Sequence, residues 1–430
     1  MKVVINPPRE QWKELVKRPE KNKDELSTLV NDIIDMVKRR GDDALKELTK
    51  KHDGATLSAL CVTPSEINEA IEKVPAALQL AIRQAAANIK KFHLSQISTE
   101  PKIETAPGVW CWRKNIPVQK VGLYVPGGTA PLFSTVLMLG IPAMIAGCRE
   151  IILCTPPDRH GTIHPAVLFA ASVIGISQIY KTGGAQAIAA MAYGTATIPA
   201  VSKIFGPGNQ YVTAAKQLIS SDGIAIDMPA GPSEVAVFAD SSANADYVAS
   251  DLLSQAEHGP DSQVLLVTTD KQFAEQVKNA ISKQLEDLPR KAIAEEALNN
   301  STVVVVSDEA AAMELLNEYA PEHLILACEN SEALAEKVLN AGSVFLGHLS
   351  PESAGDYASG TNHTLPTNGY AKAYSGVSVM SFMKQVTFQQ LTGEGLLSIG
   401  PAVMEMAAAE GLQGHANAIA IRMNDKKSKV

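Results

Sequence analysis

Short apolar runs alternate with helical patterns from about residue 119 to residue 346. Nine of these runs have the length and the β-branched content of buried strands. They are Lys120–Val125, Glu150–Cys154, Gln178–Lys181, Lys203–Phe205, Glu234–Phe238, Gln263–Thr268, Thr302–Val306, Leu324–Ala327 and Ser343–Leu346. Helical segments separate most of them, which predicts an α/β protein with mainly parallel sheets. Nine strands exceed one modest sheet, so we expect two Rossmann-like units, one inserted in the other.

The two ends of the chain have helical patterns. Within the first 40 residues, apolar positions recur at spacings of three and four, which is typical of an amphipathic helix. These positions are Leu26, Leu29, Val30, Ile33, Ile34 and Val37. The basic run Lys38–Arg40 and Gly41 mark the end of this helix. Residues 401–424 return to an Ala- and Met-rich helical pattern, so we expect small helical N- and C-terminal segments.

The segment from Val121 to Cys148 contains no charged residue and is long enough to cross a membrane. Proline and glycine interrupt it at Pro126-Gly127-Gly128 and again near its middle, which divides it into strand, loop and helix. We therefore expect a buried strand and a buried helix, and no membrane. The chain has 38 Lys+Arg against 46 Asp+Glu, a net charge of −8. This balance argues against nucleic acid as a partner.

The cysteines indicate the compartment. Their number is odd, they are widely spaced, and none forms a CxxC pair: Cys61, Cys111, Cys148, Cys154 and Cys328. This pattern predicts neither a disulfide framework nor a thiolate zinc site. We expect a reducing compartment, the cytoplasm.

Two short polar motifs could carry chemistry. Gln255 and His258 stand three apart at a helix end marked by Gly259, so both could contact one ion. Glu322 and His323 are adjacent and could supply two bases for different proton transfers. Neighbours on a regular strand point to opposite faces, so both could serve one site only if Glu322 is still in a loop. A capping pair and a pair at a strand end are the ordinary alternatives.

The Gly- and Ser-rich segment 350–376 is too long for an ordinary connection and is typical of a functional loop. It offers Asp356 as an oxygen ligand and His363 as a donor or ligand. Near the C-terminus, Glu410 ends a helix and His415 follows a short break. Four of these residues would make a nitrogen and oxygen site for zinc, or for exchangeable manganese or cobalt: Gln255, His258, Asp356 and His415. Each of them alone could equally be a solvated polar residue.

Three glycine-rich turns lie between expected strands and helices. They are Pro126-Gly127-Gly128, Gly183-Gly184-Ala185-Gln186 and Gly206-Pro207-Gly208-Asn209. The third lacks the last glycine of the GxGxxG dinucleotide motif. Such turns could bring backbone amides and helix N-termini to phosphates. Tight turns without a ligand explain them equally well.

Long blocks of the chain closely resemble the L-histidinol dehydrogenase family. The blocks are VGLYVPGGTAPLFSTVLML from Val121, GGAQAIAA from Gly183, KIFGPGN from Lys203, DMPAGPSEV from Asp227, SDLLSQAEHGPDSQV from Ser250, PEHLI from Pro321 and GSVFLGHLSPESAGDYASGTNHTLPT from Gly342. They occur in the same order as in the family, and the resemblance covers nearly the whole chain, from the N-terminal helices to AAAEGLQGH near its end. The resemblance implies a zinc-dependent, four-electron oxidation of L-histidinol through L-histidinal to L-histidine with two NAD⁺, the last steps of histidine biosynthesis.

The resemblance also implies roles for individual residues. The zinc ligands, one zinc per subunit, would be Gln255, His258, Asp356 and His415. The catalytic acid–base pair would be Glu322 and His323. NAD would contact Tyr124, Gln186 and Asn209. The substrate would contact Ser233, Gln255, His258, His323, Asp356, His363, Glu410 and His415.

A homodimer with shared active sites is a further implication, in which Glu410 and His415 would come from the partner subunit. The corresponding division is an N-terminal arm (1–22), a main α/β domain with the metal and catalytic residues (23–124 and 232–375), an inserted NAD-binding domain (125–231) and a C-terminal dimerisation segment (376–430).

Three other functions are compatible with the individual motifs. One is a related enzyme that oxidises another small alcohol to an acid by the same two steps. A zinc hydrolase would also use His, Asp and Glu around a metal, but it has no need of a dinucleotide unit. A non-catalytic zinc protein would leave the Glu322–His323 pair without a role.

Overall fold

The computed structural model describes residues 1–18, 23–127, 131–229 and 231–427. Backbone contacts divide the chain into two compact units, residues 1–95 with 118–382 and residues 96–117 with 383–430. The described strands form two parallel sheets in the first unit and one antiparallel sheet in the second. The predicted α/β class with two mainly parallel sheets is therefore confirmed, and all nine predicted strands are present within one residue at either end.

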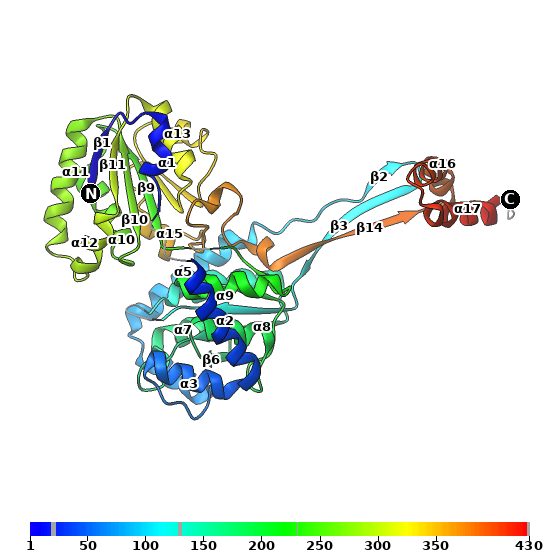
Figure 1. The fold of residues 1–430 in the computed structure, drawn as a ribbon, viewed down its shortest axis with the longest axis horizontal. Coiled ribbons are helices and arrows are strands. Elements are labelled where there is room, and N and C mark those ends of the chain that lie inside the picture. The colour runs from blue at the N-terminus through cyan, green and yellow to red at the C-terminus, as the bar shows by residue number, and fades with distance from the viewer. Residues whose placement is uncertain (19–22, 128–130, 230, 428–430) are drawn as a thin grey trace. The chain divides into compact units, whose positions relative to one another are not determined.

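The six-stranded sheet has the strand order β1-β11-β10-β9-β12-β13. Its strands are β1 (Lys2–Ile5), β11 (Thr302–Val305), β10 (Gln263–Thr268), β9 (Glu234–Ala239), β12 (His323–Ala327) and β13 (Ser343–Leu346). Along β9 the side chains of Val235 and Val237 join one apolar cluster, while Ala236 and Phe238 join another. The two faces of the sheet are thus both covered (Figure 1), which explains the continuous apolar runs in the sequence. The covering helices are α10 (Ala245–Ala256), α11 (Lys271–Leu285) and α12 (Lys291–Asn299) on the first cluster, and α1 (Trp12–Leu15), α13 (Glu309–Tyr319) and α14 (Ser331–Ala335) on the second.

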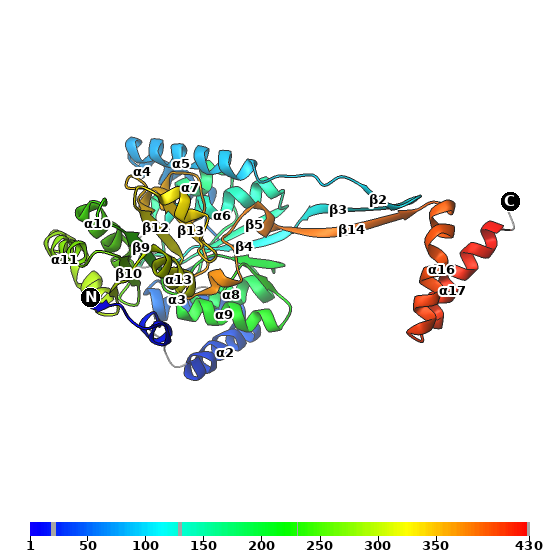
Figure 2. The ribbon, with the colours of Figure 1, turned by 90° about the horizontal axis from the view of Figure 1, so that it is seen from above.

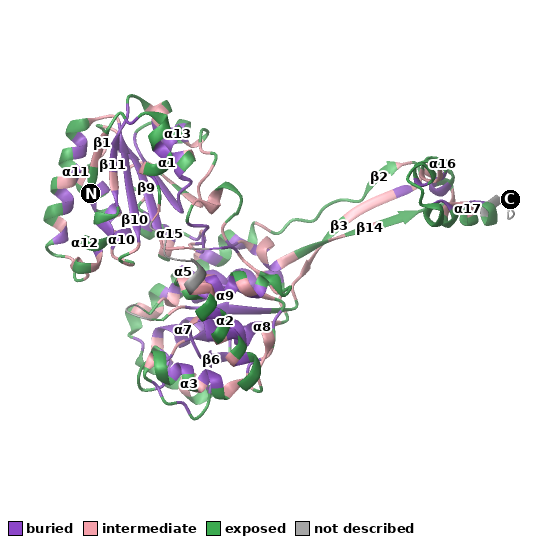
Figure 3. Ribbon diagram, in the orientation of Figure 1, coloured by how far each residue is buried: buried purple, intermediate pink, exposed green. Residues whose placement is uncertain are grey.

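The five-stranded sheet has the order β6-β5-β4-β7-β8. Its strands are β6 (Ile179–Lys181), β5 (Glu150–Thr155), β4 (Lys120–Tyr124), β7 (Lys203–Phe205) and β8 (Ala225–Ile226). Figure 2 shows helices on both sides of the sheet, α6 (Phe133–Ala146) and α7 (Pro165–Val173) on one side and α8 (Gly184–Tyr193) and α9 (Gln210–Ser221) on the other. The uncharged segment forms β4 and the buried helix α6, as predicted, and no helix of the described residues is long and apolar enough to cross a membrane. Figure 3 shows the inner strands β9 and β10 buried. The strands β1, β8 and β13 contain no buried residue.

The N-terminal helices pack on the five-stranded sheet. They are α2 (Lys23–Arg40), α3 (Asp42–Asp53), α4 (Pro64–Lys73) and α5 (Ala76–Leu94). Val30 and Ile34 of α2 share a core cluster with Ile188 and Met191 of α8. We expected residues 23–124 to belong with the six-stranded sheet, whereas these helices pack on the five-stranded sheet. The sequence could not distinguish the two, because an amphipathic stripe does not show which sheet it covers. The domain boundaries as a whole stay a prediction.

The expectation of helix across the first 40 residues was wrong for residues 2–5. This segment is β1, which pairs in parallel with β11 at the edge of the six-stranded sheet. Trp12 and Val16 follow it, after a 3₁₀ turn (Arg9–Gln11), and lie in the core beneath the sheet. A four-residue edge strand with partly exposed side chains has too little apolar periodicity to be recognised from the sequence.

The second unit contains an antiparallel sheet, which the sequence analysis missed. It is formed by β14 (Met383–Leu391), β3 (Val109–Pro117) and β2 (Ile103–Ala106) in that order, followed by α16 (Gly393–Ala409) and α17 (Gln413–Lys427). None of the nine residues of β14 is buried, so this strand has no apolar run to mark it. The helical C-terminal segment is confirmed.

In the five-stranded sheet, Gly206 directly follows β7 and lies close to the neighbouring strand β4. Its φ is +131°, and a Cβ atom there would lie 2.1 Å from the main-chain oxygen of Tyr124. We predict that Gly206→Ala lowers the free energy of unfolding by about 2–4 kcal/mol, since backbone strain and overpacking add. Gly223→Ala is the control: it has a φ of +89° but nothing within 4 Å. Urea denaturation should show a clearly smaller loss for the control, and equal losses would contradict the close approach.

Candidate active site

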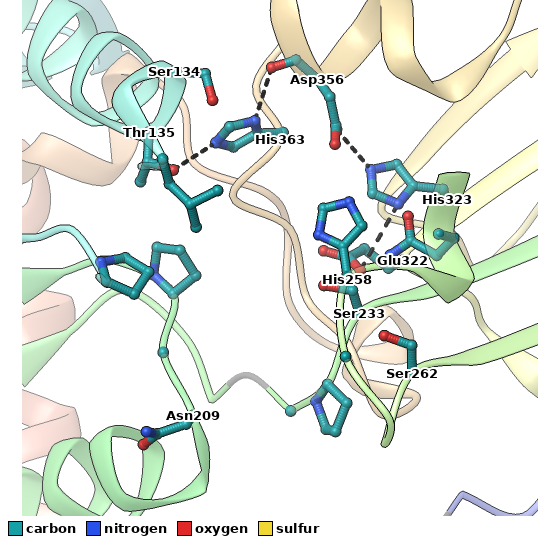
Figure 4. Close-up of a pocket in the computed structure, with 18 of the residues that line it drawn as sticks. Ser134, Thr135, Asn209, Ser233, His258, Ser262, Glu322, His323, Asp356 and His363 are labelled. Atoms are coloured by element: carbon teal, nitrogen blue, oxygen red, sulfur yellow. Dashed lines mark hydrogen bonds and ion pairs between the residues drawn. The ribbon is translucent and has the colours of Figure 1, made fainter. Parts of the chain in front are cut away.

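The two parallel sheets contribute opposite edges to one cavity of about 250 Å³. Pro126 follows the end of β4 and Asn209 follows the end of β7, so the five-stranded sheet contributes its carboxyl edge. Ser233 precedes β9 and His323 begins β12, so the six-stranded sheet contributes its amino edge. Figure 4 shows Asn209 on one side of the cavity and Ser233 and His323 on the other.

Glu322 and His323 meet the geometric condition set by their adjacent positions. Ala320 is the C-cap of helix α13 and has the left-handed conformation, with a φ of 51°. Strand β12 begins only at His323. Glu322 therefore belongs to the preceding loop, and its Oε2 lies 3.8 Å from Nδ1 of His323. Both side chains are buried. The pair can therefore act on one substrate.

The main chain of Glu234 contacts both members of this pair. Its N–H donates to Oε2 of Glu322 at 3.0 Å, and its carbonyl oxygen lies 3.3 Å from Nδ1 of His323. A proton on Nδ1 would be donated to that carbonyl, which leaves Nε2 as the basic nitrogen. Nε2 lies 3.5 Å from Oδ1 of Asp356.

Burial and mutual repulsion control the charge in this site. Burial raises the pKa of Glu322 to about 8, and that of Glu352 to about 8 as well. For His323, burial lowers the pKa, but the surrounding carboxylates, Glu322 first among them, outweigh it and raise the pKa to about 10. Burial also opposes ionisation of Asp356, but hydrogen bonding to His323 and the nearby histidines lower its pKa to about 2. Near neutral pH both glutamates are therefore largely protonated, and the imidazolium of His323 balances the carboxylate of Asp356.

Three side chains form a group that could hold a cation. The ligand atoms of His258, Glu352 and Asp356 all lie within 4.8 Å of one another. Oδ1 of Asp356 is buried, and its contact with Nε2 of His323, at 3.5 Å, is long, which leaves this oxygen able to bind a cation. Nitrogen and carboxylate donors without a thiolate suit zinc or a related divalent ion, and such a charge would favour the ionised forms of Glu352 and Asp356. The residues therefore fit a metal.

The sequence analysis did not assign a role to Glu352. It lies on the short helix α15 (Glu352–Tyr357), one turn before Asp356, so both carboxylates point to the same side. This i,i+4 pair was the signal that could have identified it. Gln255 lies beside it at the end of α10. With its amide oriented to satisfy both neighbours, its nitrogen lies 2.6 Å from Oε1 of Glu352 and its oxygen accepts from the Glu234 N–H at 3.2 Å.

His363 connects the two sides of the cavity. Its Nδ1 lies 2.9 Å from the main-chain oxygen of Asp356, and its Nε2 lies 3.2 Å from Oγ1 of Thr135 on α6. Ser233 lines the cavity next to Glu234. The structure thus brings together these expected site residues: Ser233, Gln255, His258, Glu322, His323, Asp356 and His363.

Of the three expected NAD contacts, Asn209 lines the cavity, where its side chain caps α9 by accepting the Tyr211 N–H at 3.0 Å. Tyr124 and Gln186 are buried and are not among the described lining residues. The hydroxyl of Tyr124 accepts the Gly184 N–H at 3.1 Å.

Close packing accounts for glycine in all three turns, since Gly206 in the third turn approaches the main-chain oxygen of Tyr124. A Cβ atom on Gly127 or Gly183 would lie 2.3 or 2.5 Å from the ring of Pro156. These two positions therefore require glycine whether or not a phosphate binds. Gly128 lies outside the described residues.

Glu410 and His415 belong to the second unit. Glu410 is the C-cap of α16, and His415 lies in the first turn of α17. The cavity is lined by residues of the first unit. The expected roles of these two residues stay a prediction.

The fold and the site together define an α/β protein in which a buried Glu322–His323 pair adjoins a group that could hold a cation, an arrangement suited to an enzyme. A family model described as histidinol dehydrogenase matches residues 16–423. The chain is 58% identical over 427 residues to the histidinol dehydrogenase of Bacteroides thetaiotaomicron, covering 99% of this chain and 100% of that protein. It is 50% identical over 423 residues to that of Escherichia coli, covering 98% and 96%.

A solved structure agrees with the sequence relatives. The crystal structure of histidinol dehydrogenase from Elizabethkingia anophelis superimposes with a TM-score of 0.96 at 54% identity, covering 99% of this chain and 98% of that chain. The chain belongs to the histidinol dehydrogenase family, and it is an oxidoreductase of histidine biosynthesis. This membership argues against the zinc hydrolase and the non-catalytic zinc protein.

The crowded carboxylates predict how stability depends on pH. Because the folded pKa of Glu352 lies near 8 and its unfolded value near 4.5, its contribution to stability is complete below pH 4.5 and is lost as the pH rises through about 8. In metal-free protein, the free energy of unfolding should fall between pH 5 and pH 8.5, and Glu352→Gln should make this fall smaller by roughly 1–3 kcal/mol. Urea denaturation with chelator present measures this loss. The exposed Glu332→Gln is the control with the same change of charge, and a wild-type pH slope in Glu352→Gln would contradict the prediction.

Proposed function

We propose that this chain oxidises L-histidinol through L-histidinal to L-histidine with zinc and two NAD⁺, as the final enzyme of histidine biosynthesis. The observation that carries the proposal is the buried Glu322–His323 pair beside the group His258, Glu352 and Asp356. Family membership over nearly the whole chain supports the substrate and the reaction.

The metal would be held by Gln255, His258 and Asp356, with His415 of a second subunit completing four ligands. When bound, zinc supplies a Lewis acid that holds and orients the nitrogen atoms of the substrate. Glu352 supports this site through its contacts with Gln255 and with Ser254, whose hydroxyl donates to it at 3.0 Å. A carboxylate that fixes a ligand side chain is a common feature of metal sites.

The proton transfers are performed by the buried pair. His323 takes the proton of the carbinol hydroxyl at Nε2, while its Nδ1–H is held by the Glu234 carbonyl. A cation next to Asp356 lowers the pKa of His323, which frees Nε2 for this role. Glu322 then assists the addition of water to the aldehyde. Its carboxylate is held by the Glu234 N–H, and its raised pKa, about 8, suits proton exchange near neutral pH.

The five-stranded sheet would bind the dinucleotide. NAD, when bound, accepts one hydride in each half of the reaction. Strands β4 and β7 are the point where the strand order of this sheet reverses, and ligands of parallel α/β sheets bind at the carboxyl ends of such strands. The N-terminus of α9, with Asn209 as its cap, and the Tyr124 and Gln186 side chains would contact NAD from this edge.

A homodimer would complete the site with Glu410 and His415 of the partner subunit. The exposed apolar side chains of α16, of α17 and of the turn between them support a partner surface on the second unit. These side chains are Leu397, Met406, Leu412 and Ile421. Ser233 and His363 would contact the substrate from the first unit, together with the zinc ligands.

We predict two NADH per L-histidinol in an absorbance assay. Because the metal is needed to hold the substrate, chelation should abolish turnover and added zinc should restore it. One NADH with release of the aldehyde would contradict the two-step cycle. Turnover that survives complete chelation would contradict the metal site.

The shared site can be tested by mixing inactive subunits. In a heterodimer of His258→Ala and His415→Ala subunits, one of the two sites receives an intact His258 and an intact His415. Random mixing should therefore restore about a quarter of the wild-type activity. If each subunit built its own site, verified heterodimers would stay inactive.

A further inference from the structure

The side chain of Glu234, at the start of β9, is fully buried and held by Arg18 of the N-terminal segment. Arg18 donates from Nε to Oε1 at 3.0 Å and from Nη2 to Oε2 at 2.6 Å. The exposed fraction is 14% for the arginine side chain and 2% for the glutamate. The main-chain N–H of Asn368 donates a further hydrogen bond to Oε1. Glu234 therefore has every hydrogen bond that a buried carboxylate needs.

Arg18 is itself held in place by the ends of α13 and β10. Its Nη2 donates to the main-chain oxygen of Tyr319 at 2.8 Å, and its guanidinium lies 4.0 Å from the centre of the Tyr319 ring. The Tyr319 hydroxyl donates to Gln263, whose amide donates in turn to the main-chain oxygen of Lys17 at 3.1 Å. The N-terminal segment is thus docked at the amino edge of the six-stranded sheet.

The peptide groups of Glu234 face the catalytic side of the same edge. Its N–H contacts Oε2 of Glu322 at 3.0 Å and the amide oxygen of Gln255 at 3.2 Å. Its carbonyl oxygen contacts Nδ1 of His323 at 3.3 Å. One residue therefore contacts the acid, the base and a ligand of the metal group through its main chain, while its side chain points away to Arg18.

We propose that Arg18 is a positioning residue: by holding Glu234, it sets the orientation of Glu322 and His323. This proposal rests on the proposed function of that pair. Arg18 does not line the active-site cavity, so it acts through Glu234 and not on the substrate. A buried ion pair contributes little net stability, since desolvation offsets its attraction. Its bidentate geometry instead defines one position for both partners.

Removal of the arginine leaves a buried carboxylate without its partner. The start of β9 would then shift to bring Glu234 to water or to another donor. Because the hydrogen bonds of the catalytic pair end on the peptide groups of the same residue, they shift with it. A displacement of about 1 Å in a catalytic group can lower the rate on the order of 100-fold.

The experiment compares three variants of the zinc-loaded enzyme. Arg18→Lys keeps the charge but loses the bidentate contact, and Arg18→Met removes both the charge and the contact. Arg18→Met/Glu234→Gln removes both charges and keeps an oxygen for the Asn368 N–H. The control is Arg9→Met, which removes an arginine of the same segment that pairs with Glu314 at the surface.

We expect Arg18→Lys to lower kcat on the order of 10- to 100-fold. The KM values for L-histidinol and NAD should stay within about threefold, and zinc content and circular dichroism should match the wild type. The double variant should have a higher kcat than Arg18→Met, since it leaves no unpaired buried charge. Arg9→Met should behave as the wild type.

Other results would overturn the proposal. They are a kcat of Arg18→Lys within twofold of the wild type, a loss of thermal stability alone, or a change confined to KM or zinc content. If Arg18→Met does not fold, Arg18→Lys decides. If the wild type and Arg9→Met do not reduce NAD with L-histidinol, the proposed function fails and the positioning role fails with it. Normal turnover in both, with unchanged kcat in Arg18→Lys, refutes the positioning role alone.

Discussion

Two buried carboxylates and one partly buried carboxylate surround one imidazole, and the rest of the site depends on how that charge is balanced. Glu322, Glu352 and Asp356 all lie within 4 Å of His323. In a poorly solvated site such charges are tolerated only when they are paired or protonated, or when they bind a cation. Burial raises the pKa of Glu322 and of Glu352 to about 8, while the carboxylates around His323, Glu322 first among them, outweigh burial and raise its pKa to about 10. A divalent ion beside His258 and Asp356 would favour the ionised carboxylates and would leave His323 free as a base.

The two sheets use opposite edges, and this divides their tasks. The five-stranded sheet presents its carboxyl edge at the β4–β7 reversal, the usual binding place in parallel α/β sheets. The six-stranded sheet presents its amino edge, where β9 and β12 begin. At this edge the first peptide groups of β9 are free to bind side chains, and Glu234 uses them to hold Glu322 and His323. One sheet is thus suited to a cofactor and the other to proton transfer.

Local patterns predicted much of the fold and most of the residues around the cavity. All nine strands were recognised because continuous apolar runs reflect burial on both faces. The exposed strand β14 and the short edge strand β1 were missed because neither has such a run. Of the seven expected site residues that the structure brings to the cavity, the polar motifs singled out all but Ser233, and the family resemblance assigned their roles. Glu352 was missed although it lies one helical turn from Asp356.

The sequence by itself determined nine strands of the parallel sheets, the buried helix α6 and the motifs around Gln255, Glu322 and Asp356. These features depend on neighbours along the chain. Only the tertiary structure decided that α2 packs on α8, that Glu322 and His323 share one site and that Arg18 holds Glu234. Arg18 and Glu234 are separated by 216 positions. No periodicity or spacing connects residues so far apart, because the contact exists only once the N-terminal segment docks at the amino edge of the six-stranded sheet.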